Sequence, residues 1–428
     1  MPDRSSPPPI YPIRELHLPP IQSDQLQNGL PVAVIEQRGD HEVIKLDWVF
    51  RAGRPFERQP MTARLTQLML REGSRNHTAA DIAEHLDFYG SSLSLPFHLD
   101  VAQVSVYTLR KHFPKVLSLL ADLVLLPLFS EEEFQRLVER SIAQWQVDLG
   151  RNDVVAYRQI TEALFGAEHP YGYNSHEKIY RERSTTDLRR HHDRFFHAGH
   201  AHLYLGGPIG DTEWQLLEQF IGQVMPAGQP IQPQIPPPQP GEQRLWVKGA
   251  GTKQSAVRLG RRLFNRHHPD YPGLYVLNTI LGGYFGSRLM TNIREDKGYT
   301  YNIYSTLDSM RYDGTWLISF EVSPQHVEAG LQEVYREMDT LCQHLVTEDE
   351  LHMVRNYLLG TFLTMLDGPF HALDLKIGLE TDGLPDSFFQ DLIETTLHIQ
   401  PATLLQLAQK YLKREDWTLL VVSGSAES

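Results

Sequence analysis

The order of the predicted elements repeats on the two sides of a proline-rich stretch, and this repeat restricts the possible folds more than any other feature. The stretch covers residues 226–241, and its prolines exclude a helix or a central strand. Each side reads as a strand, two helices, two strands, two long helices, a further helix and a final strand. The sequence therefore predicts an α+β fold of two similar halves in tandem, each a largely antiparallel sheet that helices cover on one face.

The boundaries follow from this repeat. Ser130-x-x-Glu133 and Thr347-x-x-Glu350 predict capping boxes that occupy equivalent places in the two halves. We expect an N-terminal extension over residues 1–24, a first half over 25–225, a linker over 226–243 and a second half over 244–428.

Composition narrows the possible functions. The net charge of −13 argues against a nucleic-acid partner and against an anionic membrane surface. Cys342 is the only cysteine, which excludes an intrachain disulfide and suits a reducing compartment. The N-terminus has no apolar signal core, and the longest apolar run, 116–129, is too short to span a bilayer. We therefore expect a soluble cytoplasmic protein with no membrane partner.

The segment from Gly282 to Tyr301 carries the most specific functional pattern. It predicts a glycine-rich turn, an amphipathic helix over 287–296 that a glycine ends, and then a strand over 299–305. Arg294 at the helix end and Tyr301 on the strand can converge on one point, and both side chains are hydrogen-bond donors. Such a pair can grip a peptide carbonyl and stabilise the oxyanion that forms on it.

This segment closely resembles the Arg/Tyr substrate-clamp segment of the pitrilysin/insulinase-type (inverted-motif zinc) peptidases. In the order and spacing of elements the resemblance covers about residues 25–424, and His169-Pro-Tyr-Gly172 is similar to a further family signature. It implies the same tandem halves and the metallopeptidase fold of the processing peptidases.

The resemblance also implies roles for single residues. Arg294 and Tyr301 would act on the substrate carbonyl at a zinc site that a partner supplies. A helix cap and a tight turn explain the glycines of the turn equally well. The turn residues that the resemblance would assign to substrate binding are Gly282, Gly283, Phe285 and Ser287.

The zinc motif of that family is absent. On the first long helix, predicted over 57–71, the His-x-x-Glu-His positions fall on Arg64, Gln67 and Leu68, and the later Glu ligand falls near Gln146. Zinc requires neutral imidazoles and carboxylate oxygens, which none of these four side chains supplies. We therefore expect a chain that holds no zinc and no other cofactor.

Two other groups look like metal motifs, and for both the sequence favours a structural role. Asp81-Ile-Ala-Glu-His85 lies one helix too late, and Thr78 with Asp81 predicts a capping box there. Five histidines gather within twelve residues, but no Asp or Glu at a suitable spacing completes a metal site. They are His191, His192, His197, His200 and His202.

Taken together, the resemblance implies the zinc-less subunit of a two-subunit bacterial peptidase, similar to the alpha-type subunits of the mitochondrial processing peptidase. Such a chain is inactive alone. Its expected partner is a homologous chain with His-x-x-Glu-His, and its expected substrate is an unfolded peptide held between the two. The long glycine-rich loop of those alpha subunits is absent, which argues against presequence recognition. Two alternatives stay open: a structural core subunit of a larger complex, as in cytochrome bc complexes, and a stand-alone peptide-binding protein.

Overall fold

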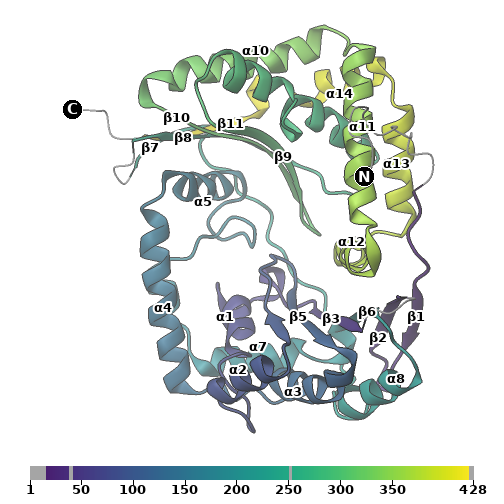
Figure 1. The fold of residues 1–428 in the computed structure, drawn as a ribbon. Coiled ribbons are helices and arrows are strands. Elements are labelled where there is room, and N and C mark those ends of the chain that lie inside the picture. The colour runs from purple at the N-terminus through teal and green to yellow at the C-terminus, as the bar shows by residue number, and fades with distance from the viewer. Residues whose placement is uncertain (1–15, 38–41, 250–252, 424–428) are drawn as a thin grey trace, which may run out of the picture.

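The structure is a computed structural model, and it describes residues 16–37, 42–249 and 253–423. This part of the chain forms two sheets with their helices, which Figure 1 shows one above the other. No helix in these ranges is long and apolar enough to cross a bilayer.

The first sheet has six strands in the order β1-β2-β6-β3-β5-β4, and only β2 and β6 pair in parallel. The alternation along β3 sets its two faces, because Ile44, Leu46 and Trp48 enter the main core of this half whereas Lys45 and Asp47 face the other way. The strands are β1 (Gln22–Gln25), β2 (Pro31–Glu36), β3 (Val43–Phe50), β4 (Ser92–Ser94), β5 (Ala102–Leu109) and β6 (Ala201–Gly207). The helices before the linker are α1 (Thr62–Met69), α2 (Ala79–Phe88), α3 (Phe113–Leu125), α4 (Glu131–Leu149), α5 (Asn152–Phe165), α6 (Glu177–Arg181), α7 (Thr185–Phe195) and α8 (Asp211–Leu217).

The second sheet has five strands in the order β7-β11-β8-β10-β9, and only β7 and β11 pair in parallel. On β10 the residues Trp316, Ile318, Phe320 and Val322 are all buried in one core, as their alternation predicts. The strands are β7 (Arg244–Lys248), β8 (Ser255–Leu263), β9 (Ile303–Ser309), β10 (Gly314–Val322) and β11 (Thr418–Ser423). The helices are α9 (Tyr271–Asn278), α10 (Val327–Gln343), α11 (Glu348–Met365), α12 (Gly368–Asp382), α13 (Ser387–His398) and α14 (Pro401–Tyr411), with π-helices over Thr279–Gly283 and Met290–Asp296.

The two sheets share one topology. The order β2-β6-β3-β5-β4 of the first sheet corresponds strand by strand to β7-β11-β8-β10-β9 of the second, and the parallel pair has the same place in both. This correspondence confirms the prediction of two similar α+β halves in tandem.

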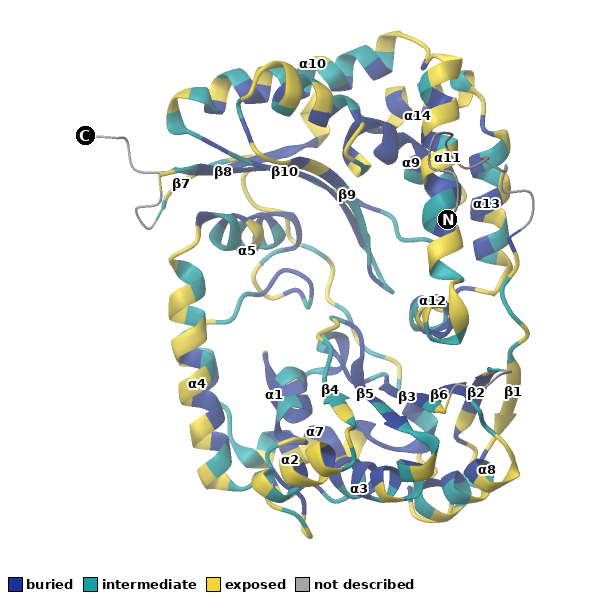
Figure 2. Cartoon of the chain, in the orientation of Figure 1, coloured by how far each residue is buried: buried dark blue, intermediate teal, exposed yellow. Residues whose placement is uncertain are grey.

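Each half lends one helix to the other. Helix α5 precedes the linker but packs on the second sheet, where Ile160 and Leu164 meet Leu317 and Leu420. Helix α12 follows β10 but packs on the first sheet through one further core cluster. Figure 1 shows α5 beneath the second sheet and α12 above the first, and in Figure 2 the central strands that they cover are mostly buried. The two halves are therefore joined by two exchanged hydrophobic contacts.

Polar contacts reinforce the packing of α12 on the first sheet. Glu380 accepts a hydrogen bond from the Tyr204 hydroxyl at 2.5 Å, and its carboxylate lies 2.7 Å from Nδ1 of His202. Lys45 forms an ion pair with Asp374. Both first-half strands in these contacts use the face that points away from the main core of that half.

Several predicted boundaries were wrong for local reasons. The helix predicted over 57–71 begins only at Thr62, because Pro60 precedes it and Met61 takes a left-handed φ of +70°. The strand predicted over 299–305 begins at Ile303, so Tyr301 lies just before β9.

Two of the three predicted N-terminal caps are present. Thr78 and Asp81 form the full capping box, and the Thr347 hydroxyl accepts a hydrogen bond from the Glu350 N–H. The prediction for Ser130 is wrong, since its side chain makes no capping hydrogen bond.

Candidate functional site

The predicted Arg/Tyr pair lies at the end of a short helix. The helix ends at Asp296, mostly in π-helical form, and Gly298 follows with a φ of +65°, a conformation that favours glycine. The chain then reverses toward β9. This turn brings Tyr301 back to Arg294, and the predicted helix with its glycine stop is confirmed.

Arg294 and Tyr301 are in direct contact through the backbone. Nε of Arg294 donates to the Tyr301 carbonyl at 3.0 Å, and its guanidinium lies 4.6 Å from the centre of the Phe285 ring. The Tyr301 side chain is 88 % exposed, and no described residue is hydrogen-bonded to its hydroxyl. The Arg294 guanidinium is thus held against the helix end, and the Tyr301 hydroxyl beside it is exposed to solvent.

The other residues of the turn divide into exposed and packed positions. Gly283 and Phe285 are exposed, and the Phe285 ring lies against Arg294. Gly282 is buried, and a Cβ there would lie 2.7 Å from Cβ of Ser305, so its lack of a side chain serves packing on β9 rather than approach of a substrate. Ser287 is also buried. Of the four turn residues predicted for substrate binding, a ligand can therefore reach Gly283 and Phe285.

A small pocket of about 260 Å³ opens beside Tyr301. Arg258 and Glu321 project into it from β8 and β10, and Tyr304 from β9. Burial lowers the pKa of Arg258, and its guanidinium donates to the backbone carbonyls of Val257 and Asp153. Sequence reasoning missed this pocket, although the alternation along β8 places Arg258 on the face opposite Val257 and Leu259.

The residues at the positions of the family's zinc motif are hydrogen-bonded to one another and to nearby backbone carbonyls. The Gln67 amide donates to the carbonyls of Pro96 and Gln103 at 3.0 and 2.8 Å, and its oxygen accepts from Arg64 at 2.8 Å. The Arg64 guanidinium, whose pKa is lowered by burial, also lies 5.2 Å from the centre of the Phe97 ring. A cation of the protein occupies the place, so these residues do not fit zinc.

The structure does not place the predicted fourth residue, Gln146, at this site. Gln146 is exposed on α4 and does not face Arg64 or Leu68. A pocket of about 410 Å³ between α1 and α4 is lined instead by Ser141, Gln144, Trp145 and Asp148, which share one helical face. The residue count from Leu68 crosses loops, so it led to Gln146, which lies a fraction of a helical turn away from this face. Within the ranges that the structure covers, no three His, Cys, Asp or Glu side chains are grouped to hold a metal.

The five clustered histidines serve separate structural contacts. Nε2 of His191 lies 2.9 Å from the Ala52 carbonyl, and Nδ1 of His200 lies 2.9 Å from the Arg51 carbonyl. Burial lowers the pKa of both to about 4, so they are neutral at pH 7. The remaining three contact other groups: His192 the Val124 carbonyl, His197 the Arg194 carbonyl and His202 the Glu380 carboxylate.

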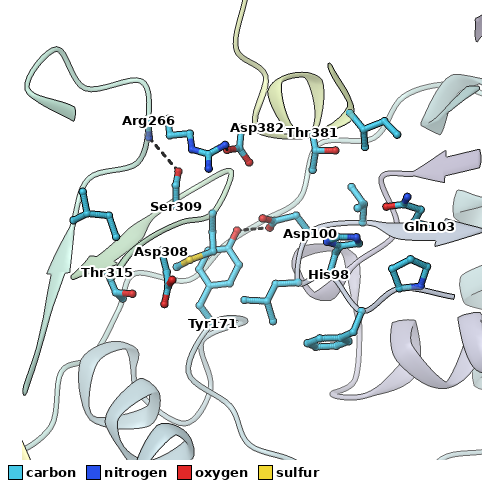
Figure 3. A pocket seen from close by; sticks show the side chains of 18 of the residues that line it. His98, Asp100, Gln103, Tyr171, Arg266, Asp308, Ser309, Thr315, Thr381 and Asp382 are labelled. Carbon is cyan, nitrogen blue, oxygen red and sulfur yellow. Dashed lines mark hydrogen bonds and ion pairs between the residues drawn. The ribbon is translucent and has the colours of Figure 1, made fainter. Parts of the chain in front are cut away.

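The two halves enclose a further cavity that the sequence analysis missed. It has a volume of about 730 Å³, and Figure 3 shows its polar residues, which come from segments far apart in the chain. At one wall Asp100 of the first half accepts hydrogen bonds from the Tyr171 hydroxyl and from the Arg311 N–H of the second half. No local motif marks such residues, because the joining of the halves brings them together.

The fold and the site define a tandem α+β protein of the metallopeptidase type in which the metal position holds no ligands. Comparison with known proteins agrees. Residues 184–358 match the family model described as the Peptidase M16 inactive domain. The Bacillus subtilis protein named uncharacterized zinc protease YmxG is 23 % identical over 303 residues, which cover 70 % of this chain and 73 % of that protein.

Two further matches have names of inactive proteins. The Helicobacter pylori protein named non-peptidase homolog YmxG is 21 % identical over 370 residues, which cover 85 % of this chain and 84 % of that one. The crystal structure of a peptidase M16 inactive domain from Pseudomonas fluorescens superposes with a TM-score of 0.86 at 22 % identity, covering 95 % of this chain and 99 % of that one, so the fold is shared. The chain is thus similar to proteins of the pitrilysin/insulinase (M16) peptidase family, of which one has the name of a zinc protease and others have names of inactive proteins.

Proposed function

We propose that this chain is the zinc-less subunit of a two-subunit peptidase and that it binds the peptide substrate for a homologous, zinc-bearing partner. One observation carries the proposal: Arg294 and Tyr301 form an exposed donor pair in a chain whose metal position is filled by Arg64 and Gln67. A chain that had lost every catalytic role would have no reason to keep an ordered donor pair in solvent.

The chemistry of the pair suits an amide carbonyl. Arg294 is held by the hydrogen bond from its Nε to the Tyr301 carbonyl, and its Nη1 lies 3.8 Å from the Glu295 carboxylate, too far for a hydrogen bond, so its other N–H groups can still donate. The Tyr301 hydroxyl supplies a second, neutral donor. Fixed donors aimed at a developing oxyanion are typically worth about 3–4 kcal/mol each. The partner would supply the metal and the general base, and this chain would supply the donors.

The experiment mixes this chain with a homologous chain that carries His-x-x-Glu-His and follows cleavage of an unfolded peptide. The mixture should cleave the peptide, whereas each chain alone should not. Metal analysis should find zinc with the partner and none bound stoichiometrically to this chain. One tightly bound zinc per molecule of this chain would contradict the proposal.

Two substitutions test the donor pair itself. Tyr301→Phe and Arg294→Ala should each lower kcat about a hundredfold or more while the two chains still assemble. The matched controls are Tyr357→Phe on α11, where the side chain is 42 % exposed, and Arg336→Ala on α10, where it is 68 % exposed. Full activity of the Arg294→Ala/Tyr301→Phe double variant would refute the role of the pair and leave an architectural subunit.

A further inference from the structure

The cavity of about 730 Å³ between the halves has one feature that the proposed function leaves unexplained, a carboxylate without a counter-ion. Four Asp side chains line the cavity against a single guanidinium, that of Arg266. Burial lowers the pKa of the lining His98, so it is uncharged at pH 7. The cavity is therefore anionic, and the question is which of its carboxylates are already paired.

Three of the four carboxylates have partners within the protein. Asp100 accepts from the Tyr171 hydroxyl and from a backbone N–H, Asp382 lies 3.1 Å from Nη1 of Arg266, and Asp374 pairs with Lys45. Each of these three carboxylates therefore already has a partner within the protein.

Asp308 is the exception. It lies on β9, where no described residue forms a hydrogen bond or an ion pair with its carboxylate, and Figure 3 shows it beside the cavity without a dashed contact. Its β10 neighbour across the ladder, Thr315, lines the same cavity. Desolvation raises the pKa of Asp308, and no nearby cation opposes that effect. A partly desolvated carboxylate is stabilised when a ligand brings the missing positive charge.

The position of Asp308 relative to the clamp defines the ligand further. Tyr301 stands just before β9, and Asp308 lies seven residues later on the same segment. At about 3.3 Å per residue, the two side chains are separated by roughly 20 Å along the strand. Tyr157 of α5 also lines the cavity, and burial together with the charge of Asp308 raises the pKa of its hydroxyl. An extended peptide held at Tyr301 therefore reaches the cavity about six or seven residues from the clamped bond.

We propose that this cavity is a subsite for a cationic side chain, lysine or arginine, of the peptide, with Asp308 as its counter-ion. The proposal rests on the proposed function for the nature of the substrate. The ammonium or guanidinium would meet Asp308, and apolar walls would cover the methylene stem. These walls are formed by Phe97, Leu307, Met310 and Ile377.

The test uses the full chain without any partner and two small probes, so it does not depend on catalysis. N-acetyl-lysine methylamide and N-acetyl-norleucine methylamide differ by the ammonium group, and their binding is measured by titration calorimetry or ligand-observed NMR. The lysine probe should bind at least about tenfold more tightly, the usual size of one charge-assisted contact. Equal binding of the two probes by the wild-type chain overturns the proposal, whatever any variant does.

Substitutions then locate the charge. Asp308→Asn keeps the shape and should abolish the preference for lysine, whereas Asp391→Asn, at an exposed site on α13, should keep it. A preference that survives Asp308→Asn overturns the assignment. The Arg294→Ala/Tyr301→Phe variant should bind the lysine probe like the wild type. If the probes fail but that variant still abolishes cleavage in the mixture, the cavity proposal falls and the proposed function stands.

Discussion

Replacing Glu380 by Gln should weaken the contact that holds helix α12 on the first sheet. Glu380 is the centre of this contact: it accepts from the Tyr204 hydroxyl at 2.5 Å, lies 2.7 Å from Nδ1 of His202 and pairs with Lys376 at 2.8 Å. The Tyr204 and His202 contacts go to one carboxylate oxygen and the Lys376 contact to the other, so the uncharged amide of Gln, with one acceptor oxygen, loses at least the ion pair with Lys376.

The pKa of Glu380 sets the magnitude. Burial alone would raise it, but the hydrogen bonds and charges of His202, Lys376 and Tyr204 outweigh burial and lower it to about 2. Each pKa unit corresponds to about 1.4 kcal/mol, so the fall from the ordinary 4.5 corresponds to about 3 kcal/mol. Since 25 % of the side chain is exposed, solvent screening reduces this value, and we expect a loss of about 2 kcal/mol in the free energy of unfolding.

The pH dependence gives the sharper test. A carboxyl whose folded pKa is lowered stabilises the fold above its unfolded pKa of 4.5 and loses that effect as the pH falls toward 2. Urea denaturation at several pH values should therefore show a gap between wild type and Glu380→Gln that is full at pH 7 and shrinks below pH 4.5. Glu84→Gln, at an exposed site on α2, is the control and should show no gap. No loss at pH 7, or a gap that does not change with pH, would refute the reasoning.

Three further substitutions should change the stability of the fold, two of them upward and one downward. Burial raises the pKa of Glu57 to about 7, so the free energy of unfolding falls as the pH rises from 4.5 through 7. Glu57→Gln removes this ionisation and should reduce the fall. In urea denaturation at pH 8 the variant should therefore be more stable than wild type. Gly282→Ala should lower stability by about 1–3 kcal/mol, because the new methyl would lie 2.7 Å from Cβ of Ser305. Gly360→Ala, inside α11 with open space around it, should instead raise stability by about 1 kcal/mol, and thermal denaturation of the pair decides this.

Local chemistry made part of the site predictable. The glycine stop after the helix, the return of the chain and the approach of Arg294 to Tyr301 all lie within one short segment, so neighbouring residues determine them. The capping box at Thr78 and the buried face of β10 are local in the same sense. The repeat of elements added the tandem halves, because a duplicated pattern implies a duplicated topology.

The contacts between the halves could not be predicted in this way. The amphipathic pattern of a helix shows that one face is buried but not which sheet covers it, so the exchange of α5 and α12 leaves no local signal. Only that exchange brings Asp100, Asp308 and Glu380 to the region between the two halves. Gln146 failed for a related reason, since the residue count between α1 and α4 crosses loops whose path the sequence does not fix.

A last prediction concerns position 67 of the lost zinc motif and whether the catalytic glutamate could return there. Gln67 is 3 % exposed, and both of its amide hydrogens are used, one on the Pro96 carbonyl and one on the Gln103 carbonyl. These bonds tie α1 to β5 and to the segment between β4 and β5. The glutamate that catalysis would require at position 67 has no hydrogen to donate when ionised, and it would set its negative oxygens against two carbonyls.

Gln67→Glu should therefore lower the free energy of unfolding at pH 7 by about 3 kcal/mol, the cost of two unpaired buried carbonyls offset in part by attraction to Arg64. Part of the loss should return at low pH, where the protonated carboxyl can donate once. Urea denaturation at pH 7 and pH 4.5 measures both effects, and Gln215→Glu at an exposed site on α8 is the control. If Gln67→Glu were as stable as wild type, the site would still accept the catalytic glutamate, and the missing ligands at Arg64, Leu68 and on α4 would separate it from a zinc site. If it is destabilised as expected, the hydrogen bonds of Gln67 have a structural role, and the catalytic glutamate cannot return at position 67 without loosening the fold.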